Sequence, residues 1–539
     1  MRQRDIVSRP SRSNLLALSR RGALAGGAAV LAEIALGDPA LAAQVTPKGK
    51  MTLAWHTAMA PRWLDPQEHD GTATPDNFMF ALHDALIKNS GTKLYDQPAL
   101  AESFEFAKDS KSATFRLRQG IKFHNNEPVT PEDVKWSFEH YRGALAASFK
   151  AKTDRIEIVD PRTVRFHFKE PFLDFLLLFG SGNVCGAGWV VPAKYYQQVG
   201  PDGFKRKPIG AGPYKLVGLE AGTKLEFEAF EGYYKPVHVK QFTIVSVPEG
   251  STRAAMLERG EADIVYGIPG ELVDRVKGNA KLMLAPVLSG NFWLEFPGFQ
   301  DPKNPFHDKR VREAVSLALN RNAINDAEAA GQGKVGGNWI NNDVLYALEW
   351  PALEHNVEKA KALLKEAGHP NGFTVDWLTP LAPFYSRGER IVAQLQQVGI
   401  RAKLQTMERG VFLQRTRANK DQWPGVQIIM HGARIGGTWA NWFESGFKCG
   451  GHNVGDRACV KEIDDKFAKY VASQDPAERK RLAEEIQKAI LENYYLVPVF
   501  RHAFMCGIGP RIAAAKWQDV FSTITTGYAY PWEDIKLKG

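Results

Sequence analysis

Residues 113–138 read ATFRLRQGIKFHNNEPVTPEDVKWSF and combine two different periodicities, separated by a turn. Apolar and basic side chains alternate over residues 115–118, which predicts a half-buried strand. Thr130-Pro131-Glu132-Asp133 is a capping box with proline at the first helical position, and it predicts a helix that runs through Phe138. The polar residues between the two elements predict a hairpin tip that leads into the helix.

The same two signals recur along the rest of the chain. Strand-like alternation is seen at residues 164–168 and 225–228. Asn356 is placed to cap a helix over 357–367 that ends at Gly368, and Asp475-Pro476-Ala477-Glu478 begins another helix. Because strand and helix signals are mixed throughout, the sequence predicts an α/β protein.

Length and composition narrow the class of protein. The 539 residues are enough for two or three domains, and 44% hydrophobic with 24% charged residues is typical of a globular chain. After the N-terminus no apolar run approaches the roughly 20 residues that a membrane-spanning helix needs. The net charge is +9, and basic residues are interleaved with acidic ones rather than gathered in a stripe. We therefore expect neither a multi-span membrane protein nor a nucleic-acid-binding protein.

Residues 1–43 are typical of an export signal. A basic region ends in Ser19-Arg20-Arg21, an Ala/Gly-rich stretch covers residues 22–36, and Ala40-Leu41-Ala42 has the small-x-small pattern of a cleavage site. The arginine pair resembles a twin-arginine signal, but Ala23 stands where such signals often carry Phe, so the Sec route stays open. We expect cleavage near Ala42 or Ala43 and a periplasmic protein, with no lipid anchor.

All four cysteines lie after this cleavage site and would enter an oxidising compartment. Cys449 and Cys459 bracket a glycine-containing loop, and we predict a disulfide that closes it. Zinc is the alternative, but the spacing is not CxxC and His452 alone does not complete a tetrahedral set. The sequence leaves open whether Cys185 pairs with Cys506.

Motifs of enzyme active sites are missing. The chain has no HExxH, no GxSxG and no GxxxxGK[ST] phosphate loop. Gly210-Ala211-Gly212 begins a dinucleotide-binding pattern, but Lys215 occupies the place of the third glycine. The histidines are scattered, and only His69 and His431 are kept as candidate ligands of a metal. We therefore expect neither an enzyme nor a bound cofactor.

From Met51 onward the chain resembles the family 5 solute-binding proteins of bacterial ABC importers, which bind peptides, nickel and opines. The motifs follow the order of that family and cover nearly all of the mature chain. They are LDP (64–66), LAESF (100–104), ATFRLRQGIKFH (113–124), NNEPVTPEDV (125–134), PIGAGPY (208–214), STR (251–253), GEADI (260–264), PFHDKRVREA (305–314), EAG (366–368) and QQVGI (396–400). One departure is that Asn125 and Asn126 replace the usual Asp-Gly.

The resemblance implies a bilobed periplasmic binding protein fold of type II, cluster C, with an extra inserted domain. Domain I would comprise residues 44–82, 191–300 and 499–539, domain II residues 83–190, and domain III residues 301–498. A solute would be enclosed between domains I and III by hinge closure and delivered to an ABC permease with its ATPase. We expect the protein to act as a monomer.

One stretch of sequence bears on specificity. In peptide-binding relatives an aspartate in a GWxxDxxDP stretch pairs with the amine of the ligand, whereas the matching residues 431–443 (HGARIGGTWANWF) contain no carboxylate and carry Arg434. A buried ammonium without a counter-charge is costly, so a free-amine peptide is disfavoured. Arg434 suits a carboxylate or phosphate, although it could instead pair with Glu444.

Further residues are expected in the cleft by the same resemblance, with core packing as the alternative for each aromatic. They are Thr57, Met59, Tyr266, Trp293, Tyr385, Arg387, His431, Trp439 and Trp442. The predicted ligand is a small polar organic solute, peptide-like or acidic. The alternative within the same family is nickel or a metal chelate, which would use His69 or His431.

Overall fold

The computed structural model describes residues 45–539 apart from 70–74, 89–96, 144, 173, 181–187, 342–343, 381–384, 417–425, 433–438, 450–458, 474 and 522–528. The predicted export signal, Cys185 and Arg434 lie outside the described residues. So do the side chains of His431 and Trp442, whose backbones belong to a described strand and helix.

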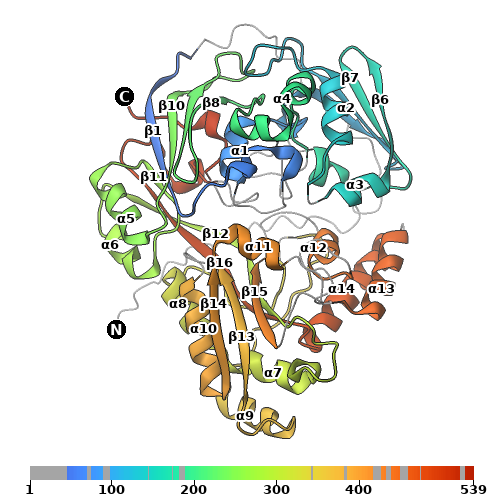
Figure 1. The fold of residues 1–539 in the computed structure, drawn as a ribbon, viewed down its shortest axis with the longest axis vertical. Coiled ribbons are helices and arrows are strands. Elements are labelled where there is room, and N and C mark those ends of the chain that lie inside the picture. Colours follow the sequence, from blue (N-terminus) through green and yellow to red (C-terminus); the bar gives the residue numbers. More distant parts are fainter. Residues whose placement is uncertain are drawn as a thin grey trace, which may run out of the picture.

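A ten-stranded sheet runs through both lobes of the molecule (Figure 1). Its strand order is β14-β13-β15-β12-β16-β11-β1-β10-β9-β8. In chain order the strands are β1 (Lys48–Trp55), β8 (Tyr214–Glu220), β9 (Lys224–Ala229), β10 (Val239–Ser246), β11 (Ile264–Val265), β12 (Met283–Glu295), β13 (Phe373–Pro380), β14 (Ile400–Met407), β15 (Gln427–Gly432) and β16 (Leu496–Ile508). Strands β11, β1, β10, β9 and β8 belong to the upper lobe of Figure 1, and strands β14, β13 and β15 belong to the lower lobe.

The long antiparallel strands β12 and β16 join the two lobes (Figure 1). Their pairing is interrupted between Leu288 and Asn291, opposite His502, and shifts again between Phe292 and Trp293. An irregularity of this kind locally disrupts the ladder and bends the strand. Side chains bridge the gap, since the hydroxyl of Ser289 donates to the carbonyl of His502 at 3.0 Å and Nε of Arg501 donates to the carbonyl of Ser289 at 2.8 Å. The regular pairing of the sheet is therefore broken at the crossing between the lobes.

A second sheet forms the right side of the upper lobe, in the order β4 (Ala101–Phe106), β5 (Ser112–Leu117), β7 (Thr163–Phe168) and β6 (Thr153–Asp160). Helices α2 (Pro131–Glu139) and α3 (Ala146–Lys152) pack beside it. The predicted strand and capped helix are confirmed as β5 and α2, and both hydrogen bonds of the capping box form between Thr130 and Asp133. Phenylalanines of this sheet and of α2 fill a shared aromatic core.

Two of the signature segments of the sequence hold each other in place. The backbone N–H of Gly210 donates to Nδ1 of His124 at 3.2 Å, and Nε2 of His124 lies 3.0 Å from the carbonyl of Gly212. Burial lowers the pKa of His124 to about 4, so the ring is neutral and donates through Nε2. A Cβ atom at position 210 would lie 1.9 Å from the carbonyl oxygen of Leu82, so only glycine fits at this position without a shift of the backbone. The motif around Gly210 and Gly212 thus has a structural role.

The remaining helices of the upper lobe are α1 (Asp76–Leu82), α4 (Ala193–Arg206), α5 (Gly250–Arg259) and α6 (Val273–Lys277), and a short ladder joins β2 (Ile87–Lys88) to β3 (Gln97–Pro98). The lower lobe carries α7 (Lys309–Ala318), α8 (Arg321–Ala329), α9 (Val357–Glu366), α10 (Tyr385–Gln397), α11 (Arg409–Thr416), α12 (Trp439–Gly446), α13 (Lys461–Ala472) and α14 (Pro476–Glu492). Asn356 and Asp475 cap α9 and α14 as predicted. No described helix is both long and apolar enough to cross a membrane.

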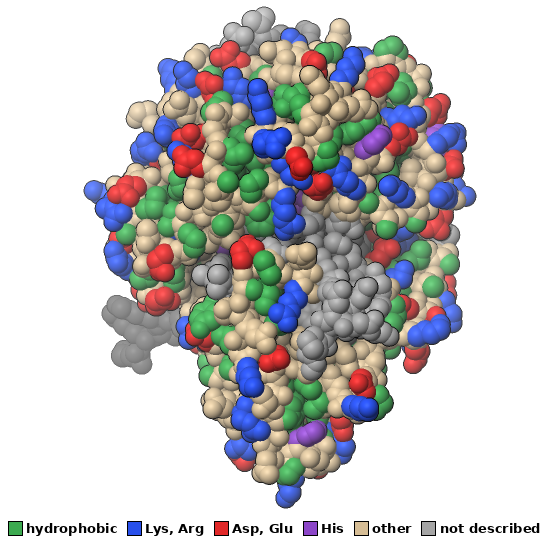
Figure 2. Space-filling model, viewed as in Figure 1, with side chains coloured by type: hydrophobic (Ala, Val, Ile, Leu, Met, Phe, Trp, Pro, Cys, Tyr) green, Lys and Arg blue, Asp and Glu red, His purple; other side chains and the backbone are tan. Residues whose placement is uncertain are grey.

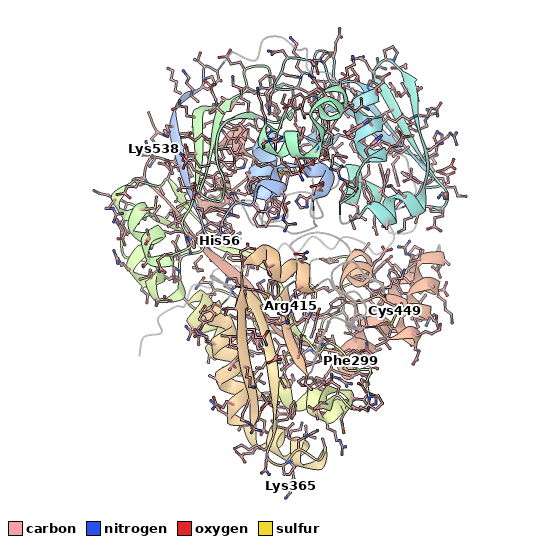
Figure 3. All side chains as sticks on the ribbon, in the orientation of Figure 1. His56, Phe299, Lys365, Arg415, Cys449 and Lys538 are labelled. Carbon is pink, nitrogen blue, oxygen red and sulfur yellow. A yellow bond between two sulfur atoms is a disulfide. The ribbon has the colours of Figure 1, made fainter. Side chains whose placement is uncertain are left out.

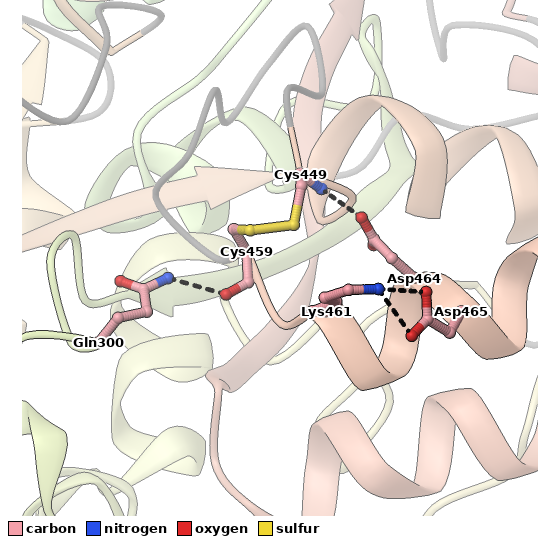
Figure 4. The surroundings of a disulfide bond; sticks show 6 residues. All are labelled: Gln300, Cys449, Cys459, Lys461, Asp464 and Asp465. Carbon is pink, nitrogen blue, oxygen red and sulfur yellow. Dashed lines mark hydrogen bonds and ion pairs between the residues drawn. A yellow bond between two sulfur atoms is a disulfide. The ribbon is translucent and has the colours of Figure 1, made fainter.

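A disulfide joins Cys449 to Cys459 in the lower lobe (Figure 4). The backbone N–H of Cys449 donates to Asp464 at 3.1 Å, and the amide of Gln300 donates to the carbonyl of Cys459 at 3.1 Å. Cys506 is buried and has a free thiol. The domain boundaries at 82/83, 190/191, 300/301 and 498/499 remain predictions.

Candidate functional site: a cavity between the lobes

A cavity of about 540 Å³ lies between the lobes, beside the crossing strand β16. The upper lobe contributes the loops at 248–250 and 267–271 together with Arg253, and β16 contributes His502, Phe504 and Met505. The lower lobe contributes the end of α8 and the first turns of α10. Figure 1 shows α5 on the upper side of this region and α8 with α10 below it. The volume is in the usual range for a small-molecule site.

Arg253 fixes the upper wall of the cavity. This buried side chain donates to the carbonyls of Val247 at 2.7 Å and Pro248 at 2.8 Å, and also to that of Gly267. Burial lowers its pKa to about 10, so the guanidinium remains charged at neutral pH. Because one side chain binds both wall-forming loops, the two loops are held in a fixed relation to each other.

The lower wall carries a group of charged side chains. The Glu328 carboxylate accepts from Nε of Arg390 at 2.8 Å and from the hydroxyl of Ser386 at 3.2 Å, and it lies 3.7 Å from Nε of Arg387. Arg387 is only 2% exposed and stacks on Phe292, with its guanidinium carbon 4.3 Å from the ring centre. Burial lowers the pKa of Arg387, and Glu328 partly opposes that shift.

Aromatic rings form the side of the cavity along β16. The rings of His502 and Phe504 lie 4.7 Å apart, and His502 is also in edge contact with Phe500. Burial, followed by the charge of Arg387, lowers the pKa of His502 well below its ordinary value. His502 is therefore a neutral polar group in an otherwise apolar wall. Nearby, the ring of His56, labelled at the junction of the lobes in Figure 3, packs on Tyr266 at 4.8 Å.

Two of the residues predicted from the sequence, Tyr385 and Arg387, line this cavity. Tyr266 lies behind its wall, where it stacks on Trp55 and packs against Phe504 at 4.9 Å. Thr57 is buried two residues after β1 and does not line the cavity.

Three further predicted residues have structural partners away from the cavity. Met59 is buried, and its backbone pairs with Gly222 in an isolated bridge. Trp293 donates to Glu295 at 2.8 Å, and Trp439 is fully buried against α13 in the core of the lower lobe. Arg434 and the side chains of His431 and Trp442 are not described. A ligand role for each predicted residue stays a prediction.

The sequence interpretation missed four residues that line the cavity: Arg253, Glu328, Arg390 and His502. Two signals could have indicated them. Arg387 and Arg390 stand three positions apart, the spacing of one helix face, and aromatic rings alternate at 500, 502 and 504 along a strand. Glu328 has no local signal, because its neighbours resemble any polar helix end.

The described residues contain no group of three or more His, Cys, Asp or Glu side chains placed to hold a metal ion. His69, one of the two histidines considered for nickel, is buried, and its Nε2 lies 3.2 Å from Asp76. The face shown in Figure 2 has acidic and basic side chains interleaved over both lobes, without a basic stripe.

Comparison with known proteins identifies the family. The family model for bacterial extracellular solute-binding proteins, family 5 Middle, matches residues 97–453. The chain belongs to this family. It is 27% identical over 479 residues to the dipeptide-binding protein of Escherichia coli K12, covering 81% of this chain and 86% of the relative. It is 28% identical over 425 residues to the glutathione-binding protein GsiB of the same strain, covering 74% and 79% of the two chains.

Solved structures share the fold. The Helicobacter pylori protein DppA in complex with the peptide STSA has a TM-score of 0.77 at 21% identity, covering 91% of this chain and 98% of that one. The Agrobacterium tumefaciens R10 protein MoaA in complex with mannopinic acid has a TM-score of 0.78 at 23% identity, covering 91% and 99%. The bilobed α/β fold of the type II periplasmic binding proteins is thus confirmed.

This membership also decides the broad function. Proteins of this family are the solute-binding components of ABC importers and not enzymes. The chain is therefore a solute-binding protein of an ABC importer, as the resemblance of its motifs implied. Members of the family act outside the cytoplasm.

Proposed function

We propose that this protein captures a small polar organic solute, peptide-like or acidic, in the cavity between its lobes and delivers it to an ABC permease and its ATPase. It would work as a monomer in the periplasm, after removal of residues 1–42 or 1–43 by either export route. The observation that supports this proposal best is a cavity of solute size lined by side chains of both lobes.

The way the lobes are connected supports closure. The cavity has walls from both lobes and lies beside the interrupted pairing of β12 and β16, between Leu288 and Asn291. A movement of one lobe relative to the other at that crossing would therefore change the shape of the cavity. A solute that contacts both the 267–271 loop of the upper lobe and Arg387 of the lower lobe would bind the closed form more tightly than the open form. That difference in affinity is what shifts the population toward closure and signals a loaded receptor to the permease.

The chemistry of the lining favours a polar ligand of modest size. Three arginines (253, 387 and 390) and three glutamates (249, 271 and 328) line a space that aromatic, aliphatic and glycine residues also line, together with Ser386 and His502. Such a mixture suits a solute that carries separate charged and apolar parts, as a short peptide does. Two relatives bind a dipeptide and glutathione according to their names, and both of these ligands fit the same description.

Native mass spectrometry tests the proposal directly. The full chain would be exported to a bacterial periplasm and measured before any dialysis, because a closed cleft releases its solute slowly. We expect a discrete added mass that disappears on mild unfolding, and tandem fragmentation would give the class of the solute. Absence of any retained mass, together with no thermal shift in a screen of peptides, organic acids, sugars and nickel, would contradict the proposal.

A further inference from the structure

We propose that Arg387 binds a carboxylate of the transported solute. The proposal rests on the function proposed above, since it names the chemical group that the cavity recognises. It concerns an arginine that is already buried, charged and located at the lower wall of the cavity.

The other buried arginines provide the comparison. Four arginines of the described chain are buried: Arg253, Arg312, Arg321 and Arg387. Three of them satisfy their guanidinium groups with several backbone carbonyls each. Arg253 donates to residues 247, 248 and 267, Arg312 to residues 306, 307 and 493, and Arg321 to residues 316, 319 and 498. These three side chains have an evident structural role.

Arg387 differs from them, because no backbone carbonyl of the described residues accepts a hydrogen bond from it. Its Nε and Nη1 are buried and have no hydrogen-bond acceptor among the described residues. Its ionic partner among the described residues, Glu328, lies 3.7 Å away, which is beyond hydrogen-bonding distance. A guanidinium has five N–H donors, and leaving them unsatisfied in a buried place is costly. A carboxylate relieves this cost best, because it accepts two parallel hydrogen bonds from one guanidinium.

The surroundings of Arg387 keep it ready for such a ligand. Its guanidinium stacks on Phe292 at 4.3 Å and lies 5.4 Å from the ring centre of Phe500, so aromatic rings fix its plane. Stacking uses the face of a guanidinium and leaves its edge for hydrogen bonds. His502, which contacts both of these rings, is neutral and adds a polar group without a competing charge.

The carboxylate of Glu328 is held by donors other than Arg387. Its two oxygens already accept from Arg390 at 2.8 Å and from Ser386 at 3.2 Å. The glutamate therefore keeps its hydrogen bonds when a second carboxylate binds Arg387. Its negative charge remains close by, however, and repels a ligand that carries several negative charges. The site thus suits a single carboxylate, as in a peptide or an amino-acid derivative.

The test compares acids with their amides. A panel of dipeptides and small monocarboxylic acids would be screened by thermal shift against the full chain, and each acid that binds would be titrated calorimetrically beside its own amide. We expect the amide to bind at least about tenfold more weakly than the acid, the usual effect of losing a charged hydrogen bond. Equal affinity for the acid and the amide would overturn the assignment.

Variants separate a ligand role from a structural one. Arg387→Met should weaken binding of the acid at least about tenfold, while Arg310→Met, at an exposed site of the same lobe, should leave it within about twofold. Glu328→Gln should strengthen binding of the acid, because it removes a negative charge close to the bound carboxylate. If Arg387 and Glu328 formed only a structural ion pair, this substitution would not strengthen binding. Arg387→Lys keeps the charge without the paired donors, so it should bind the acid with intermediate affinity even if Arg387→Met does not fold.

Failure of the proposed role of Arg387 can be told apart from failure of the proposed receptor function. If neutral or cationic solutes bind and no acid does, or if Arg387→Met and Arg387→Lys both bind the acid as the natural chain does, the role of Arg387 is wrong and the receptor function stands. If no solute of any class binds and the exported protein retains none, the proposed function itself fails.

Discussion

The ammonium of Lys88 lies 3.2 Å from the carboxylate of Glu533, although 445 positions separate the two residues in the chain. Asp84 lies 3.4 Å from the same ammonium, and the hydroxyl of Tyr233 donates to Asp84 at 2.9 Å. All of these side chains are buried. Burial acts to lower the pKa of Lys88, but the charges of Asp84 and Glu533 outweigh it and raise that pKa. The cluster therefore joins three distant segments of the upper lobe through charge.

Replacing Lys88 by Met should destabilise the fold strongly. The substitution removes the ammonium that Asp84 and Glu533 share, and breaking a buried pair in this way costs about 3 to 5 kcal/mol of unfolding free energy. Denaturation by urea, followed by tryptophan fluorescence, measures the loss. Lys488→Met is the matched control, because Lys488 is exposed and its pair with Glu492 at 3.6 Å should contribute less than about 1 kcal/mol. Equal losses for the two variants would contradict the prediction.

A methyl group at position 210 should be poorly tolerated. The Cβ of Gly210→Ala would lie 1.9 Å from the carbonyl oxygen of Leu82 and 2.7 Å from Nδ1 of His83, so the backbone must move. We expect a loss of about 3 kcal/mol or failure to accumulate as soluble protein. At Gly336 a Cβ would meet no atom within 4 Å, so Gly336→Ala serves as the control and should change stability by less than about 1 kcal/mol. Thermal unfolding and soluble yield would be compared for both.

The sequence predicts local structure well because local signals decide it. The strand at β5, the capping box at Thr130 and the helix caps at Asn356 and Asp475 each depend on residues within one or two turns. Cys449 and Cys459 are ten positions apart, so their bridge also follows from a local pattern. The motif order predicts the fold, since each motif serves a turn or a contact such as that between His124 and Gly210.

The cavity is harder to predict, because its walls come from segments that only the sheet brings together. Glu328 and His502 face the same space, and nothing near either residue in the sequence indicates the other. Tryptophans are difficult for another reason: the sequence marks them as candidate ligand contacts, but a large aromatic side chain suits a hydrophobic core equally well. Trp439 lies in the core of the lower lobe, and no periodicity in residues 431–443 distinguishes that position from one in the cleft.

Acid should destabilise the protein through His83. The side chain is fully buried, and burial lowers its pKa to about 3. Between the unfolded pKa of about 6.5 and this value, the unfolded chain binds a proton that the folded chain does not, so stability falls as the pH falls. The slope is about 1.4 kcal/mol per pH unit for one such group, which gives about 2 kcal/mol between pH 6.5 and pH 5.

Urea denaturation of His83→Asn at these two pH values measures that contribution. The variant should be less stable than the natural chain at pH 6.5 and should have a shallower dependence on pH. His140→Gln is the control, since His140 is exposed at the C-cap of α2 and its replacement should leave the slope unchanged. A slope that is the same in all three proteins would show that other groups cause the acid sensitivity.

Removing the disulfide should destabilise the lower lobe without opening the cavity. Cys449 and Cys459 enclose a short loop, and on the loop-entropy model a closed loop of this length contributes about 3 kcal/mol. The double variant Cys449→Ser/Cys459→Ser should therefore unfold at lower urea concentration, whereas its affinity for a bound solute should stay within about twofold, because neither cysteine lines the cavity. A reducing agent should reproduce the loss in the natural chain and have no further effect on the variant. If the double variant loses solute binding while keeping its stability, the loop closed by this bridge contributes to the site, and the assignment of the cavity walls must be extended to it.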